Sequence, residues 1–111
     1  MDSRYDFLDR YIYSLLDPRE DKQIVYVGQS INPQKRYEQH LNPKSENKRK
    51  NEWIKELNKL GLKPILKIET KRWTSQFIAF ETEMSVTVHY RNLGYEVLSV
   101  SKARIDKIYS I

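Results

Sequence analysis

Two short runs of β-forming residues dominate the first third of the hydrophobic pattern. Residues 11–16 (Tyr-Ile-Tyr-Ser-Leu-Leu) and 24–28 (Ile-Val-Tyr-Val-Gly) flank a polar turn at 17–22. Two such runs with a turn between them predict an antiparallel hairpin, whose second strand is expected to end at its closing glycine. A third strand is predicted at 63–70, since Pro64 stands at the first position, where a strand tolerates proline.

Capping residues and apolar stripes predict three helices between and after these strands. Asn32 caps the first, which runs to about Leu41. The second opens at Ser45 or Glu46 and ends at Gly61, and its apolar stripe is expected at Trp53, Ile54, Leu57 and Leu60. Trp53 is therefore expected in the core.

The third helix is predicted between a cap at 74 or 75 and Gly94, with an apolar face. The resulting order, β-β-α-α-β-α, predicts an α+β fold with a small three-stranded antiparallel sheet flanked by helices. A length of 111 residues suits one domain over 1–111. Its motif-bearing core is expected at about 11–100, followed by a C-terminal tail at 101–111.

Composition excludes several classes of function. Cysteine is absent, which removes disulfides, thiolate zinc sites and cysteine nucleophiles. No apolar run approaches the length of a membrane span, and the first residues lack the apolar core of a signal peptide. A cytoplasmic protein is therefore expected.

The net charge of +5 favours a polyanionic partner, because lysine and arginine release counterions when they bind phosphates. The alternative is a merely soluble basic protein. A polyanionic partner, which would be double-stranded DNA if the family resemblance described below holds, would be held through its phosphates by basic residues of the loop and the second helix. The residues expected to make these contacts are Lys44, Lys48, Arg49, Lys50 and Lys55.

Arg36 and His40 are four residues apart on the first helix, so they share one face. A solvated helix face explains such a pair in most proteins. Tyr11, Tyr13 and Tyr26 lie on predicted strands, where tyrosine is common and usually packs. No single one of these residues identifies a site.

In combination, these positions resemble the GIY-YIG nuclease superfamily. Tyr11-Ile12-Tyr13 matches its first motif with Tyr for the leading Gly, and Tyr26-Val27-Gly28 matches the second with Val for Ile. Arg36 and His40 follow on the next helix, and Glu81 lies in the late helix where the family has a glutamate. The resemblance implies a metal-dependent DNA endonuclease.

Two positions need a choice. Glu81 and Glu83 are two apart, so one helix cannot point both at a single site. The pattern favours Glu81 at the edge of the buried face, with Glu83 facing solvent. The family also has a closing Asn, and Glu96 or Ser99 occupies the candidate places here, while the nearby Asn92 is expected to end the third helix.

The resemblance further implies roles for the site residues. Glu81 would hold one Mg²⁺ or Mn²⁺, and Arg36 would contact the scissile phosphate. Tyr13 would be the general base assisted by His40, or His40 itself would be the base, and Tyr26 would orient the water. The sequence leaves the choice of base open.

A chain near the minimal catalytic size and without a DNA-reading module predicts low intrinsic sequence specificity. Specificity would then depend on a homodimer or a partner protein. Small stand-alone members are familiar in phages and mobile elements, which is the expected setting by analogy. The alternative is a catalytically weakened or inactive DNA-binding domain of the same type, because the closing Asn is missing.

Overall fold

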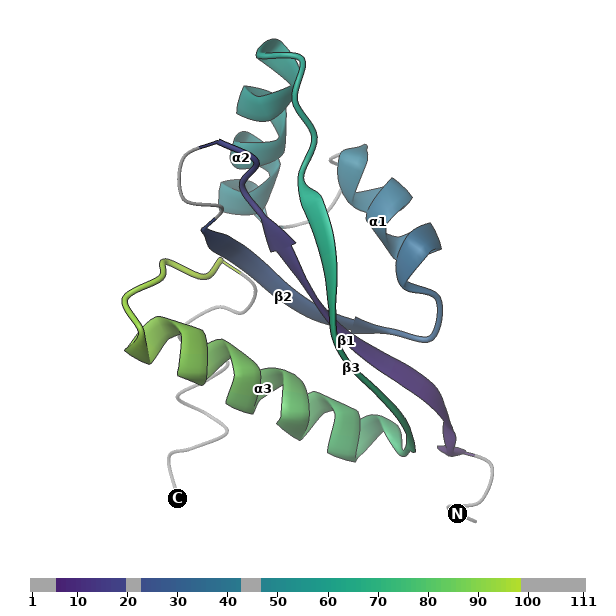
Figure 1. Cartoon of the computed structure of the whole chain (residues 1–111). Coiled ribbons are helices and arrows are strands. Elements are labelled where there is room, and N and C mark those ends of the chain that lie inside the picture. Colours follow the sequence, from purple (N-terminus) through teal and green to yellow (C-terminus); the bar gives the residue numbers. More distant parts are fainter. Residues whose placement is uncertain (1–5, 20–22, 43–46, 99–111) are drawn as a thin grey trace.

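Three strands and three helices make up the described part of the chain, which a computed structural model gives for residues 6–19, 23–42 and 47–98 (Figure 1). In order they are β1 (Leu8–Leu16), β2 (Ile24–Ser30), α1 (Pro33–Leu41), α2 (Lys48–Lys59), β3 (Ile65–Thr74) and α3 (Gln76–Asn92). The predicted order and the α+β class are confirmed. The predicted tail at 101–111 lies outside the described residues.

The three strands form one antiparallel sheet in the order β2-β1-β3, so β1 is central. β1 and β3 are longer than predicted, and β2 continues past Gly28 to Ser30. The additional residues of β3 include Lys71 and Arg72, which are exposed. A charged end of this kind lacks the apolar signal of a strand, yet it still pairs with β1.

Two hydrophobic clusters lie on opposite faces of the sheet, because side chains alternate along β1. Tyr13 and Leu15 pack with Trp53, Ile54 and Leu57 of α2. On the other face, the buried side chains of Ile12, Ile24, Val27 and Val97 pack against Val86 and Tyr90 of α3. α1 and α2 therefore cover one face and α3 the other (Figure 1).

The helix ends follow the predicted capping chemistry. The side chain of Asn32 accepts a hydrogen bond from the backbone N–H of Lys35 at 3.1 Å, and Ser75 caps α3 in the same way. α2 begins slightly later than predicted, with Asn47 as its cap. Gly61 has a φ of 69°, the left-handed conformation that a helix C-terminus favours.

Trp53 is buried, as predicted, and its indole N–H donates to Asp17 Oδ2 at 2.8 Å. Asp17 also pairs with Arg19, whose guanidinium contacts Glu56 of α2 as well. These contacts attach the end of β1 to α2. Among the described helices, none has the length and apolar character needed to cross a bilayer.

Candidate active site

The hydroxyl oxygen of Tyr13 on β1 lies 2.7 Å from Nε2 of His40 on α1. Each of these side chains is only 1% exposed. The ring of Tyr26 on β2 packs edge-on against the His40 imidazole, with their centroids 4.8 Å apart. Three residues that the sequence analysis selected from separate elements therefore form one aromatic cluster.

Gly28 allows the Tyr13 side chain to reach this position. The two residues are partners in the β1–β2 ladder. A Cβ atom on Gly28 would lie 2.6 Å from the Tyr13 hydroxyl and 2.9 Å from Cε1 of Tyr26, which is closer than real Cβ contacts come. The expectation that Gly28 ends its strand was wrong, because β2 continues to Ser30. The missing side chain of Gly28 allows the close approach of Tyr13.

Arg36 is the cation beside both tyrosines. Burial raises the pKa of Tyr13 far above its usual value, and it also raises the pKa of Tyr26. The guanidinium of Arg36 acts in the opposite direction on both hydroxyls. Arg36 is half-buried, so part of its surface is open to solvent. It is the described cation best placed to meet a phosphate next to the tyrosines.

Lys50 does not have the predicted role of an exposed DNA contact. It is 2% exposed, and its Nζ lies 2.9 Å from Nδ1 of His40. The reason is helical phase: Lys50, Trp53, Ile54 and Leu57 occupy i, i+3, i+4 and i+7, which is the buried face of α2. Extending the apolar stripe by one turn toward the N-terminus would have identified Lys50 as a buried residue. Leu60, predicted in that stripe, is 57% exposed beyond the helix end.

His40 is neutral in this environment. Burial, the Lys50 ammonium and the Arg36 guanidinium together lower the pKa of His40 to about 3. Burial and Arg36 also lower the pKa of Lys50, to about 8. At neutral pH the cluster thus contains a neutral imidazole beside a mainly charged ammonium.

Glu83, rather than Glu81, is the buried carboxylate of α3. Glu83 is 9% exposed, and its charge contributes to the raised pKa of both Tyr13 and Tyr26. Glu81 is exposed, so the predicted orientation of the two glutamates was wrong.

The error arose from the apolar pattern of α3. Its buried residues are Ala79, Glu83, Met84 and Thr87, whereas Phe77 is 66% exposed and Ile78 is at the surface. Small and polar side chains at i, i+4 and i+8 therefore lie on the buried side together with Met84, while Phe77 and Ile78 remain at the surface. The i+4 spacing from Ala79 was the signal for Glu83.

The two candidates for the missing Asn have different outcomes. Glu96 is exposed and its carboxylate pairs with the guanidinium of Arg49. It does not contribute to the pKa shift of either cluster tyrosine. Ser99 lies outside the described residues, as does Lys44.

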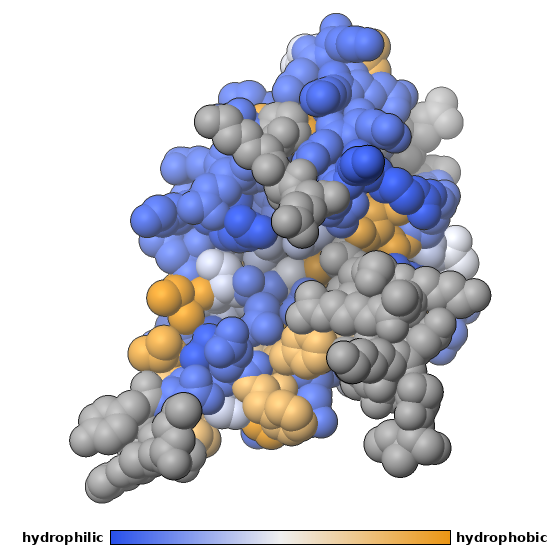
Figure 2. Space-filling model, turned by 180° about the vertical axis from the view of Figure 1, so that it is seen from behind, coloured by the Kyte–Doolittle hydropathy of each residue, from blue (hydrophilic) through white to orange (hydrophobic). Residues whose placement is uncertain are grey.

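The surface over α2 is polar (Figure 2). Lys48, Arg49 and Lys55 are exposed there, in keeping with their predicted contact with a polyanion.

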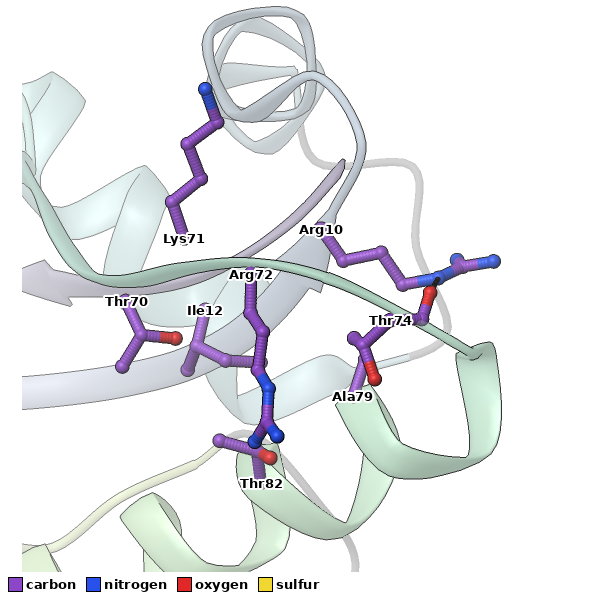
Figure 3. Close-up of a pocket in the computed structure, with 8 residues that line it drawn as sticks. All are labelled: Arg10, Ile12, Thr70, Lys71, Arg72, Thr74, Ala79 and Thr82. Atoms are coloured by element: carbon purple, nitrogen blue, oxygen red, sulfur yellow. Dashed lines mark hydrogen bonds between the residues drawn. The ribbon is translucent and has the colours of Figure 1, made fainter. Parts of the chain in front are cut away.

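A separate hollow lies between β3 and α3 on the opposite face of β1, with Ile12 at its floor (Figure 3). In this hollow Arg72 reaches from β3 toward Thr82 of α3, whereas Lys71 points away (Figure 3). Arg10 at its rim already donates to the carbonyl of Thr74. Neither Tyr13 nor Tyr26 lines this hollow.

A three-stranded antiparallel sheet with helices on both faces carries two tyrosines beside a histidine, an arrangement typical of a small nuclease-type domain. Residues 10–88 match the family model of the GIY-YIG catalytic domain, and the chain belongs to this family. The matched segment contains the tyrosine cluster and Glu83. Comparisons with curated proteins and with solved structures find no match.

Proposed function

We propose that this protein is a DNA endonuclease that hydrolyses phosphodiester bonds with the help of one divalent cation. The observation that carries the proposal is the contact of Tyr13 and Tyr26 with His40. The charges of Arg36 and of the buried Glu83 act on both tyrosines. These groups come from four elements, β1, β2, α1 and α3, of a domain with the GIY-YIG match. Acid–base groups, a cation and a carboxylate are the parts that phosphodiester hydrolysis needs.

The donor set fits a single Mg²⁺ or Mn²⁺. In the described part of the chain, no group of three or more His, Asp and Glu side chains gathers into a cage. One carboxylate, completed by waters and phosphate oxygens, suits Mg²⁺, which keeps several waters when bound. Glu83 would hold the ion, and when bound the ion would supply Lewis acidity to the phosphate.

Arg36 would bind the phosphate beside the tyrosines. A guanidinium stays charged at every pH at which the protein is folded, and its fork of donors matches phosphate oxygens. The charge of Arg36 already counteracts the rise that burial causes in the pKa of both tyrosines. Arg36 would therefore act on the phosphate and on the tyrosines together.

Tyr13 is the better candidate for the general base. Tyr13 and His40 are equally buried, but both ring nitrogens of His40 are already occupied, by Tyr13 and by Lys50. Tyr13 would first lose its own proton to solvent, a step that burial disfavours and the charge of Arg36 favours. Its oxygen would then accept a proton from the attacking water, whose oxygen bonds to phosphorus as the bond to the leaving oxygen breaks. Tyr26, which is more exposed, would orient that water.

The exposed cations of α2 would hold the DNA backbone without reading its sequence. We therefore expect low intrinsic specificity, with selectivity supplied by a second copy or by a partner protein. The setting that we expect is intracellular, in a phage or mobile element.

The test is cleavage of supercoiled plasmid with Mg²⁺ or Mn²⁺. Wild-type protein should nick the plasmid, and Glu83→Gln should lower the rate by about 100-fold or more, because a neutral amide is a poor ligand for a hard cation. Glu81→Gln is the matched control on the same helix and should cleave like wild type.

Absence of nicking with either metal would reject the proposal. DNA binding without cleavage would support the second candidate, a weakened domain, which the pairing of Glu96 with Arg49 favours. If Glu81→Gln were the inactive variant, the assignment of Glu83 would be wrong.

A further inference from the structure

His40 has a hydrogen-bonding partner at each ring nitrogen. Nε2 lies 2.7 Å from the Tyr13 hydroxyl oxygen, and Nδ1 lies 2.9 Å from the Lys50 ammonium nitrogen. All three side chains are at most 2% exposed. The chain of contacts therefore runs from α2 through α1 to β1, inside the protein.

The chemistry of the two partners decides which nitrogen carries the proton. A neutral imidazole has one N–H donor and one acceptor nitrogen, whereas a lysine ammonium has three donors and no acceptor. Nδ1 must therefore accept from Lys50, and the ring proton must be on Nε2. Nε2–H then donates to the oxygen of Tyr13.

We propose that Lys50 is a positioning residue that acts through His40, holding the imidazole in the tautomer whose Nε2–H donates to the Tyr13 oxygen. The inference rests on the proposed function, since it assigns Lys50 a part in the same reaction. A donor at the Tyr13 oxygen favours the anionic form of the phenol, which is the form that accepts a proton from water. In the opposite tautomer Nε2 would compete for the phenolic proton and offer no donor.

The surroundings of the imidazole support this role. The ionisable groups around it are Tyr13 from β1, Tyr26 from β2, Arg36 from α1 and Lys50 from α2. Glu83 acts on the two tyrosines from α3. Of these groups, Lys50 is the one whose atoms contact Nδ1.

Burying a lysine on the core face of α2 is costly, because a charged side chain is almost never fully buried without a partner. An apolar residue at this position would continue the stripe of Trp53, Ile54 and Leu57. Packing alone therefore gives no reason for a lysine at this position, whereas the contact of its ammonium with His40 gives one.

The tautomer can be read directly from ¹H–¹⁵N long-range spectra of the histidine side chains at pH 7. The sequence contains two histidines, His40 and His89, and the exposed His89 serves as an internal reference. We expect His40 as the Nε2–H form in wild type. Lys50→Met keeps the length and removes the donor, so it should populate the Nδ1–H form, and Lys50→Gln should retain more of the Nε2–H form.

An Nδ1–H tautomer in wild type would overturn the proposal, as would an unchanged spectrum in Lys50→Met. The wild-type spectrum decides the matter by itself if the variant does not fold.

The same variants are tested for plasmid nicking at saturating DNA and metal. Lys50→Met should nick about tenfold more slowly or worse, with unchanged DNA affinity, because Lys50 is buried. Lys63→Met, which changes an exposed lysine outside α2, is the control and should nick like wild type. A merely structural lysine would change thermal stability without changing the tautomer.

The two proposals fail separately. If wild type nicks DNA and Lys50→Met nicks at the same rate, the role of Lys50 is rejected and the nuclease proposal stands. If wild type does not nick, the nuclease proposal is rejected, and the catalytic role of Lys50 falls with it. The spectrum then still decides whether Lys50 sets the tautomer.

Discussion

The Tyr13 side chain occupies the space above Gly28 in the β1–β2 ladder, where any Cβ atom would lie 2.6 Å from its hydroxyl oxygen. Tyr13 reaches His40 by crossing this glycine. The hydrogen bond between Tyr13 and His40 thus depends on the absence of a Cβ atom at Gly28.

Gly28→Ala should therefore displace the Tyr13 hydroxyl and lower the nicking rate by about 100-fold, the loss that a shift of about 1 Å in a reacting group can cause. Gly61→Ala is the control. Its φ of 69° makes an alanine strained, but no atom lies within 4 Å of the new Cβ. It should cost about 1 kcal/mol of stability and leave nicking unchanged. Equal activity of Gly28→Ala and wild type would contradict the role of this contact.

Folding should be sensitive to acid because of His40. Burial and the neighbouring cations lower its pKa from 6.5 to about 3. Between these values the unfolded chain binds one more proton than the folded chain, so the free energy of unfolding rises with pH in this window. Acidification from pH 6.5 toward 3 should thus remove up to a few kcal/mol.

Urea denaturation at several pH values measures this effect. The slope of the free energy of unfolding against pH should become smaller in His40→Gln. It should stay unchanged in His89→Gln, because His89 is exposed. A wild-type slope in His40→Gln would show that other groups cause the acid sensitivity.

Glu96→Gln should strengthen DNA binding. The carboxylate of Glu96 pairs with the exposed Arg49 of α2, so its removal frees a cation for a phosphate. The salt dependence of the dissociation constant should become steeper, by up to about 0.9 in slope for one added phosphate contact. If Glu96 instead replaces the family Asn in the reaction, nicking will fall and the salt slope will stay constant.

Trp53→Phe tests the attachment of α2 to the end of β1. Phenylalanine keeps most of the buried ring but loses the N–H that donates to Asp17 at 2.8 Å. A hydrogen bond to a charged group contributes roughly 1.5–3 kcal/mol, so the free energy of unfolding measured by urea denaturation should fall by about this amount. A shift below about 0.5 kcal/mol, the range of ordinary surface substitutions, would assign the stability of this corner to Arg19 and its ion pairs.

The sequence by itself was sufficient for the elements and for most of the cluster. Alternating and helical apolar periods, with Asn32 and Ser75 as caps, are local properties of the chain, so they predicted the order of strands and helices. Tyr13, Tyr26, Arg36 and His40 were selected through motif order, and the fold brings them together.

Tertiary structure decided which face of a helix is buried, and this choice changed two assignments. Glu83 replaced Glu81 because small and polar residues of α3 face the sheet while Phe77 remains exposed. Lys50, which was expected to contact DNA, contacts His40 instead, because the buried face of α2 begins one turn earlier than its apolar residues indicate. Hydrophobicity measures what a side chain prefers, whereas burial depends on the neighbours that the sheet and the other helices supply, and a charged side chain is buried where such a neighbour provides its hydrogen bond.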